Sequence, residues 1–302
     1  MKQARAGTVA MPIGTGRALA RAADYVSLVK PRLNLLVVLS SGVGYYLGAS
    51  RGFDVQLMLE AILGTAFVAG GAAALNQVYE RDTDALMRRT RLRPLPDGRV
   101  NPSDARVFGL LLAACGLCIL AMRANVLATA LAAATLVVYL IVYTPMKRRS
   151  ARATLVGAVP GALPPLIGWT AGHGSVSTGG AALFAIVFLW QIPHFMAIAW
   201  MYRDDYRAAG FPLLPVQEPD GRRTGRQAVL YAGALLAVSI APAGVRIDSW
   251  RYAVCALGLG VALVWLAARF AAIRSDQTAR TLFLGSIIYL PLLWTAMIWD
   301  KL

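Results

Sequence analysis

Residues 153–201 read ATLVGAVPGALPPLIGWTAGHGSVSTGGAALFAIVFLWQIPHFMAIAWM and give the strongest structural signal in this chain. These 49 positions contain no Asp, Glu, Lys or Arg, and they are broken only by a turn-like Gly, Ser, Thr and His segment near residue 174. About 20 apolar residues are enough for a helix to cross the hydrocarbon core of a bilayer. The stretch therefore predicts two membrane-spanning helices joined by a short turn.

Apolar runs of the same kind recur along the rest of the chain. Residues 33–50 and 125–146 also lack charged side chains, and only 15% of the 302 residues are charged, whereas a soluble domain carries about 25%. The sequence thus predicts an all-α polytopic membrane protein with nine transmembrane helices. The expected helices are residues 27–49, 57–79, 105–122, 125–143, 153–172, 179–201, 227–245, 250–272 and 279–299.

The positions of the basic residues support this count. With a cytoplasmic N-terminus, 25 of the 30 Lys and Arg residues fall on the cytoplasmic side of the nine spans. Cytoplasmic loops of membrane proteins carry such an excess, so the C-terminus is expected on the periplasmic side. Topology and attraction to anionic headgroups account for the net charge of +15, and no nucleic-acid partner is expected. The five exceptions are Arg51, Arg123, Arg246, Arg251 and Lys301.

The N-terminal segment is basic and has no apolar core for a cleavable secretory signal. We expect residues 1–23 to be a disordered cytoplasmic tail and residues 24–302 to form a single transmembrane domain. A mitochondrial transit peptide is the alternative, but the short segment favours the plasma membrane of a bacterium. The three cysteines lie inside apolar runs and are interpreted as helix-packing residues, since no second pair completes a metal site; they are Cys115, Cys118 and Cys255.

The helix expected at 57–79 ends in an unusual polar segment. Asn76, Glu80 and Asp84 are spaced four residues apart, which places them on one face of a helix. Carboxylates with guanidinium groups just beyond suit a Mg²⁺–diphosphate, because hard oxygens bind the metal and guanidinium groups bind phosphate. A solvated helix end with ion pairs explains the carboxylates equally well, but the deeper Asn76 favours a functional site. The arginines that follow are Arg88, Arg89, Arg91 and Arg93.

A second polar segment follows the helix expected at 179–201. Its Arg203, Asp204 and Asp205 echo Arg81 and Asp82 of the first segment, although this repeat signal is weak. Two facing acidic groups could together hold two metal ions and one diphosphate.

Three further groups each allow a functional and a structural interpretation. His194, beside Trp190, is either a hydrogen-bonded core histidine or a contact for a cofactor-like substrate. The Lys147-Arg148 pair ends the fourth expected helix, and the Lys30-Pro31-Arg32 run opens the first. Both basic groups could bind phosphate or simply anchor their helices at the cytoplasmic surface.

The run beginning at Asn76 resembles the first aspartate-rich motif of the UbiA-type intramembrane prenyltransferases. Its form, Asn-x₃-Glu-Arg-Asp-x-Asp followed by Arg-Thr-x-x-Arg-Pro-Leu, is similar to that of the protohaem IX farnesyltransferases, or haem O synthases, within that family. The resemblance extends over about residues 24–290. Other matching stretches, in order, are Asp24-Tyr25 with Lys30-Pro31-Arg32, Tyr143 to Arg148, Gly157 to Gly168, Trp190 to Phe195, Asp205-Tyr206 with Gly210, and Ser286 to Leu290.

The resemblance implies a fold and a reaction. The nine helices are expected to surround a central cavity capped by cytoplasmic loops. The expected substrates are haem B and farnesyl diphosphate, with Mg²⁺ as the cofactor and haem O and diphosphate as products, in the supply of haem to terminal oxidases. Implied partners are the lipid bilayer and either haem A synthase or oxidase assembly proteins.

The resemblance also implies roles for individual residues. Asp204 and Asp205 are adjacent, unlike the Asp-x₃-Asp of many relatives, which leaves the second metal position open. Rival interpretations are a prenyltransferase with a quinone precursor as acceptor, a transporter, and a non-catalytic oxidase assembly factor. The expected metal ligands are Asn76, Glu80, Asp84, Asp204 and Asp205; the diphosphate contacts are Arg88, Arg93, Lys147 and Arg148; the haem contacts are His194, Trp190 and Arg32.

Overall fold

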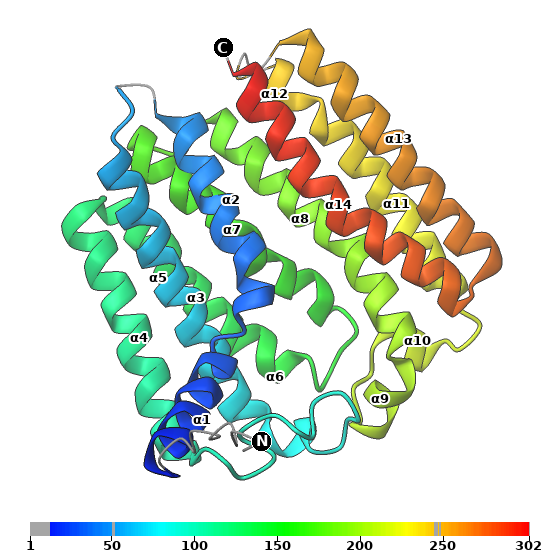
Figure 1. Cartoon of the computed structure of the whole chain (residues 1–302). Helices are drawn as coiled ribbons and strands as arrows, with labels where there is room; N and C mark the ends of the chain where they lie inside the picture. Colours follow the sequence, from blue (N-terminus) through cyan, green and yellow to red (C-terminus); the bar gives the residue numbers. More distant parts are fainter. Residues whose placement is uncertain (1–12, 50–51, 245–246, 248, 302) are drawn as a thin grey trace, which may run out of the picture.

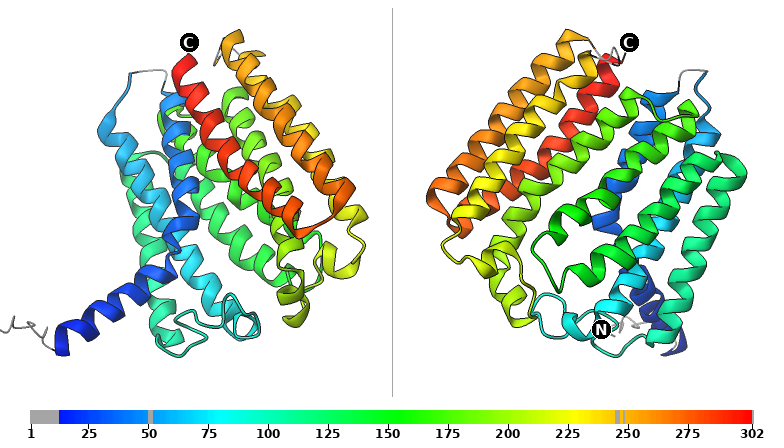
Figure 2. Two further views of the ribbon diagram at one scale, coloured as in Figure 1. Left: turned by 45° about the vertical axis from the view of Figure 1, so that its right-hand side comes forward. Right: turned by 180° about the vertical axis from the view of Figure 1, so that it is seen from behind.

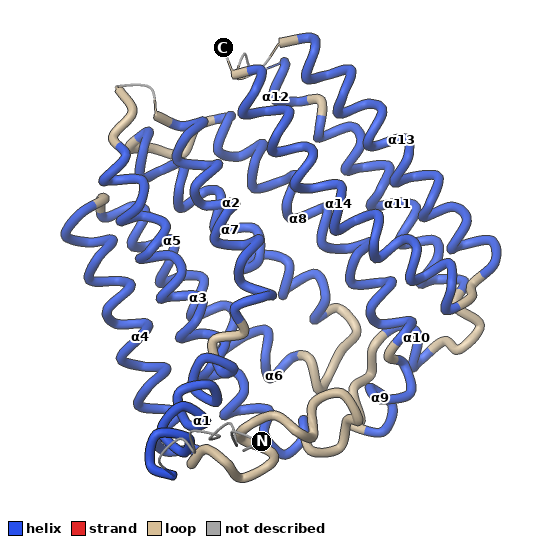
Figure 3. Tube along the Cα trace, viewed as in Figure 1, coloured by secondary structure: helices blue, strands red, loops and turns tan. Residues whose placement is uncertain are grey.

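The computed structural model describes residues 13–49, 52–244, 247 and 249–301, and the regular elements that these residues form are all helices (Figure 3). In this part of the chain, eight helices are long and apolar enough to cross a bilayer on their own. A ninth span is obtained when two helices that meet at a bend of 52° are counted together. Each of the nine expected helices has a counterpart, so the predicted fold class is confirmed.

Six of the spans are single helices: α3 (Val55–Asp84), α4 (Pro102–Arg123), α7 (Ala153–His173), α8 (Thr178–Met201), α13 (Trp250–Ile273) and α14 (Asp276–Asp300). The bent pair forms a further span, in which residues 18–28 of α1 (Ile13–Leu28) are followed by α2 (Pro31–Gly48). Two spans are composite: α5 (Val126–Val137) continues through the π-helix η1 (Val138–Tyr143) into α6 (Thr144–Met146), and α11 (Arg222–Ser239) is followed by α12 (Ala241–Gly244). Among the described residues, two helices lie outside these spans, namely α9 (Arg203–Ala208) and α10 (Leu214–Gln217).

Two helix boundaries differ from the sequence prediction. The first expected span breaks at Pro31, which begins α2 because proline suits the first turn of a helix. Lys30, just before it, takes a left-handed conformation with φ of 50°, and this residue makes the bend between α1 and α2. The second expected span ended at residue 79, but α3 continues to Asp84 and carries the acidic residues on a regular helix.

Part of the segment expected to be disordered is helical. Residues 13–23 belong to α1, whereas residues 1–12 lie outside the described residues. Leu19 and Val26 are exposed on one side of α1, and Arg21 and Asp24 lie on the opposite side. Such an amphipathic pattern allows a helix to form at a membrane surface. Figure 2 shows α1 leaning away from the bundle.

The spans pack as two groups (Figure 1). In the first group α3 packs on α4, while α2 and α5 pack on α7. In the second group α11 packs on α8 and α13, and α14 also packs on α8 and α13. The contact between α7 and α8 joins the groups, so the long charge-free stretch of the sequence forms the centre of the molecule.

The groups also meet where α2 approaches α14. Trp294 Nε1 donates to Ser40 Oγ over 3.3 Å, and Lys301 Nζ donates to the Tyr46 carbonyl over 2.5 Å. These bonds lie toward the end of the bundle at which α14 ends. Toward the other end the two helices diverge in all views (Figures 1 and 2).

Small residues let α2 and α7 pack backbone against backbone. A Cβ atom built on Gly168 would lie 1.8 Å from the Ser41 carbonyl oxygen, and one on Gly44 would lie 2.0 Å from the Pro165 carbonyl oxygen. Close approach through small residues is a common way for helices to associate in lipid. These contacts fix α7 against α2 within the first group.

The polar connections collect at one end of the bundle. Helix α1, the loop of residues 85–101, the turn of residues 147–152 and the segment containing α9 and α10 lie there, and α14 ends at the opposite side (Figure 1). An odd number of spans, such as nine, places the start and the end of the described chain at opposite ends of the bundle, as observed.

Candidate active site

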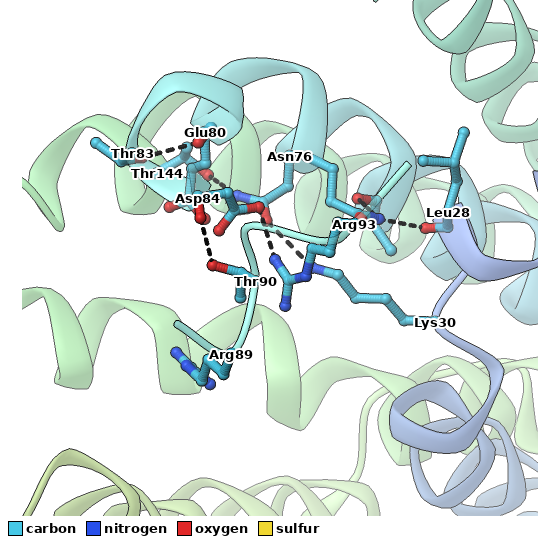
Figure 4. Close-up of polar contacts among 12 residues, drawn as sticks. Leu28, Lys30, Asn76, Glu80, Thr83, Asp84, Arg89, Thr90, Arg93 and Thr144 are labelled. Carbon is cyan, nitrogen blue, oxygen red and sulfur yellow. Dashed lines mark hydrogen bonds and ion pairs between the residues drawn. The ribbon is translucent and has the colours of Figure 1, made fainter. Parts of the chain in front are cut away.

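The polar end of α3 forms the centre of the site (Figure 4). Asn76, Glu80 and Asp84 are exposed by only 2%, 5% and 1%, and all three lie on one face of the helix, as their spacing predicts. Buried carboxylates are costly unless they are paired. Each carboxylate is accordingly matched by a cation from another segment.

The pairing is specific. Lys147 Nζ lies 3.1 and 3.3 Å from the two Glu80 carboxylate oxygens, and Arg93 Nη1 donates to Asp84 Oδ2 over 2.7 Å. Lys30 Nζ approaches Asn76 Oδ1 at 3.5 Å. We call these six residues the α3 cluster: Lys30, Asn76, Glu80, Asp84, Arg93 and Lys147.

The π-helix orients the amide of Asn76. In η1 the Thr144 backbone N–H bonds to the Tyr139 carbonyl, and the Thr144 hydroxyl donates to the same oxygen over 2.7 Å. The hydroxyl oxygen then accepts a 3.1 Å bond from Asn76 Nδ2. Because this bond engages the amide nitrogen, the carbonyl oxygen Oδ1 of Asn76 faces the cluster, where it could bind a metal ion.

The first polar loop folds back over the cluster and meets the second. Thr90 Oγ1 donates to the Asp84 carbonyl over 2.7 Å, which holds the start of the loop against the end of α3. Arg89 Nη2 donates to the Tyr206 hydroxyl over 2.7 Å, and its guanidinium lies 4.8 Å from the centre of the Tyr202 ring. The two polar segments that echo each other in sequence are therefore in contact.

The cluster shifts the titration of its two lysines. Burial alone would lower the pKa of Lys147, but attraction by Glu80 outweighs it, and the pKa lies above its usual range. Burial, followed by repulsion from Arg93, lowers the pKa of Lys30 to about 8. Lys147 is thus firmly charged, whereas the charged form of Lys30 would be stabilised by an additional negative charge nearby.

The donor set fits a Mg²⁺ ion shared with a phosphate ligand rather than a complete protein cage. Among the described residues, no group of three or more His, Cys, Asp or Glu side chains is arranged to hold a metal ion. Glu80, Asp84 and the Asn76 amide oxygen nevertheless offer hard oxygens on one face. Mg²⁺ is usually held by one or two carboxylates together with substrate phosphates. The three cations of the cluster could then pair with the phosphate oxygens.

Several predicted residues lie apart from the cluster. Arg88 and Arg148 are exposed, and neither makes a hydrogen bond or ion pair with the cluster in the described part of the chain. Arg32 is also exposed, and it lines a cavity of about 290 Å³ together with Lys30 and Arg93. The structure therefore places Arg32 with the cluster cations and not beside His194.

The second acidic pair is not brought to the first. The Asp204 side chain is 78% exposed and forms an ion pair of 2.7 Å with Arg207 in α9. Asp205 is partly exposed, and among the described residues neither aspartate joins Glu80 and Asp84 in a group of carboxylates arranged to hold a metal ion. Neighbouring positions on a helix point in different directions, so at most one of the two aspartates could face the α3 cluster.

A cavity of about 330 Å³ extends from the cluster between the two helix groups. Lys30 and Asn34 line it at one part, and Trp190, His194 and Leu290 line it at another. Most of its wall is apolar, with side chains from α2, α3, α5, α7, α8 and α14.

Two tyrosines of η1 also line this cavity. The Tyr139 and Tyr143 rings lie 5.4 Å apart. The sequence reading did not single out Tyr139, although its four-residue spacing from Tyr143 was a usable signal. The sequence shows no comparable pattern that would predict the π-helix on which the two tyrosines lie.

The predicted pair Trp190 and His194 lies in the aromatic part of the wall. Their rings stack with centroids 5.2 Å apart, and Trp190 Nε1 donates to the Ser286 carbonyl of α14 over 2.7 Å. His194 Nδ1 lies 2.8 Å from Ser286 Oγ, and the imidazole also stacks on Phe283 at 4.9 Å.

The chain is similar in sequence to proteins of known name. The profile of the UbiA prenyltransferase family matches residues 37–293. A protoheme IX farnesyltransferase of Solibacter usitatus is 44% identical over 287 residues, which cover 92% of this chain and 98% of that protein. A protoheme IX farnesyltransferase of Opitutus terrae is 44% identical over 284 residues, covering 94% and 96%.

Solved structures share the fold at low identity. A digeranylgeranylglyceryl phosphate synthase superposes with a TM-score of 0.78 at 16% identity and covers 93% of this chain and 98% of its own. A UbiA homologue from Archaeoglobus fulgidus bound to GPP and Mg²⁺ gives a TM-score of 0.66 at 16% identity, covering 91% and 99%. With its nine spans, its polar cluster at the end of α3 and the family match over most of its length, this chain belongs to the UbiA prenyltransferase family.

Proposed function

We propose that this protein transfers the farnesyl group of farnesyl diphosphate to a vinyl group of haem B, giving haem O and diphosphate. The observation that carries the proposal is the α3 cluster opening onto an apolar cavity, which offers a charged site and an apolar site side by side. The choice of haem as the acceptor is supported by relatives named protoheme IX farnesyltransferase that are 44% identical over nearly the whole chain.

In this proposal the α3 cluster binds the diphosphate. Asn76, Glu80 and Asp84 supply the oxygens that would hold Mg²⁺, and the ion would contribute neutralisation of the charge on the leaving diphosphate. Lys30, Arg93 and Lys147 are already in place to contact phosphate oxygens once the carboxylates turn to a metal. The exposed Arg32, Arg88 and Arg148 add positive potential at the entrance, and Asp204 and Asp205 stay predicted ligands of a second ion.

The cations of the cluster promote departure of the diphosphate. The bond between farnesyl C1 and the diphosphate oxygen breaks, and its electron pair leaves with that oxygen. Charge that develops on the oxygen is stabilised by Arg93 and Lys147, which are positioned before the reaction. The farnesyl group is left as an allylic cation.

The cavity wall governs the fate of this cation. The apolar side chains exclude most water, and the rings of Tyr139 and Tyr143 are available to stabilise positive charge. The terminal carbon of the haem vinyl group forms a bond to farnesyl C1, and the positive charge passes to the vinyl carbon beside the porphyrin. One water molecule adds there and releases a proton, which gives the hydroxyethylfarnesyl group.

We also propose that the polar end of the bundle faces the cytoplasm of a bacterium, with the protein in its plasma membrane. The excess of Lys and Arg at this end supports the orientation. A diphosphate substrate from the cytoplasm would reach the α3 cluster from water, while its C15 chain would enter the bundle from the apolar side.

The proposal is tested by incubating the purified protein in detergent with haem B, farnesyl diphosphate and Mg²⁺, with and without EDTA. Mass spectrometry is expected to show a Mg²⁺-dependent product that is heavier than haem B by one farnesyl and one hydroxyl group. Turnover with a hydroxybenzoate acceptor and none with haem would move the acceptor to a quinone precursor. No turnover with either acceptor would overturn the proposed activity.

A further inference from the structure

The hydrogen bonds around His194 define which of its ring nitrogens carries the proton. Ser286 Oγ donates its single hydrogen to the Phe283 carbonyl over 2.7 Å. The same oxygen lies 2.8 Å from His194 Nδ1, so in this contact Ser286 can only accept. His194 Nδ1 is therefore the donor, and in the neutral imidazole Nε2 carries a free lone pair.

This lone pair has no hydrogen-bond partner within the described part of the chain, although His194 lines the 330 Å³ cavity. A polar atom facing a largely apolar cavity costs free energy unless a ligand satisfies it. The other polar cavity residues named above are lysine, tyrosine and amide side chains. His194 is the neutral nitrogen base among the residues that line this cavity.

The surroundings hold the ring rigidly. The imidazole stacks on Trp190 of α8 and on Phe283 of α14, and Trp190 is itself bonded to the Ser286 carbonyl. A histidine that ligates a metal usually donates its other ring N–H to a fixed acceptor, which sets its tautomer and orientation. Ser286 plays that part here, since it is in turn fixed by the Phe283 carbonyl.

We propose that His194 Nε2 is the axial ligand to the iron of the acceptor haem, with Ser286 as the residue that positions it. The inference rests on the proposed function, because haem is the metal-containing substrate of that reaction. His194 lies seven residues before the end of α8, about 10 Å along the helix axis. Coordination there would hold the porphyrin at the aromatic part of the cavity, with the α3 cluster left for the diphosphate.

Haem binding without turnover tests this assignment. Purified protein would be titrated with protohaem alone, and the ferrous complex would be examined by resonance Raman spectroscopy for an iron–histidine stretching band. We expect the band in the wild type and its loss in His194→Ala, with an affinity at least tenfold lower. An elution profile in detergent that matches the wild type is the check that His194→Ala is folded. Ser286→Ala should keep the band, shift its frequency and weaken binding about tenfold.

His173→Ala provides the matched control, because His173 is the only other histidine in the sequence and lies at the far end of α7. It should retain the band. An unchanged band and affinity in His194→Ala, or loss of the band in His173→Ala alone, would overturn the assignment. The iron–histidine band in a protein that forms no farnesylated haem would support the ligand and contradict the proposed function. An unchanged rate of farnesyl transfer in His194→Ala would support the proposed function and contradict the assignment of His194 as the ligand.

Discussion

Asp84, at the end of α3, is deeply buried and is paired with an arginine. It is 1% exposed, and Arg93 is the cation that pairs with it at 2.7 Å. In the proposed reaction the carboxylate turns to the metal and Arg93 turns to the diphosphate. Asp84→Asn keeps the shape of the side chain but removes the charge that both steps require.

We expect Asp84→Asn to lower the rate of haem farnesylation at least 100-fold, about 2.7 kcal/mol of transition-state stabilisation. The protein should still insert into the membrane and elute as a single species. Asp82→Asn is the control, because Asp82 lies on the same helix but its side chain is 86% exposed and, within the described residues, forms its ion pair with Arg81. Equal rates for the two variants would contradict the role given to Asp84.

At this scale the sequence predicts the face of α3 but not the partners of its residues. The four-residue spacing of Asn76, Glu80 and Asp84 is a local property, and the helix presents them as expected. Lys147 is 67 positions from Glu80, so their contact depends on the packing of whole helices. The same applies to Arg32, a predicted haem contact, which lines a cavity together with Lys30 and Arg93.

At the scale of helices, the α2–α7 contact sets the position of the central stretch. Gly168→Ala would place a Cβ atom 1.8 Å from the Ser41 carbonyl oxygen. Because this oxygen belongs to the backbone of α2, the clash can be relieved only if the two helices move apart. We expect the thermal unfolding midpoint in detergent to fall, since such overpacking costs about 1–3 kcal/mol or more.

Gly233→Ala is the matched control in α11, where an added Cβ would have no neighbour within 4 Å. It should raise stability by about 0.5–1 kcal/mol, because alanine favours the helix more than glycine does. If Gly168→Ala had the same thermal unfolding midpoint as Gly233→Ala, the close α2–α7 contact would not control stability.

The helices themselves were largely predictable, and the exceptions have local causes. Long apolar runs identify the spans directly, since each must cross the same hydrocarbon thickness. The break at Pro31 was foreseeable from proline chemistry, but the left-handed Lys30 was not. The π-helix at Val138–Tyr143 has no distinctive sequence pattern, and it is stabilised by contacts such as that between Asn76 and Thr144.

At the scale of the whole molecule, the charge distribution and the nine spans make one prediction about topology. A reporter fused to the C-terminus should be exported: alkaline phosphatase should be active there and a fluorescent protein dark. A fusion truncated in the turn of residues 147–152 should give the reverse result, because this turn lies at the polar end. If a given reporter gave the same result at both positions, the number of spans between these positions would be even, and the count of nine would be wrong.

The most direct test of the central claim is the Mg²⁺ dependence of diphosphate binding. A non-hydrolysable farnesyl thiodiphosphate would be titrated into the wild type and into the double variant Glu80→Gln, Asp84→Asn, with Mg²⁺ or with EDTA. The wild type should bind at least tenfold more tightly with Mg²⁺, and the double variant should bind equally in both conditions, because its α3 face no longer holds the ion. If the double variant keeps the full Mg²⁺ dependence of the wild type, these carboxylates do not form the metal site and the account of the α3 cluster is wrong.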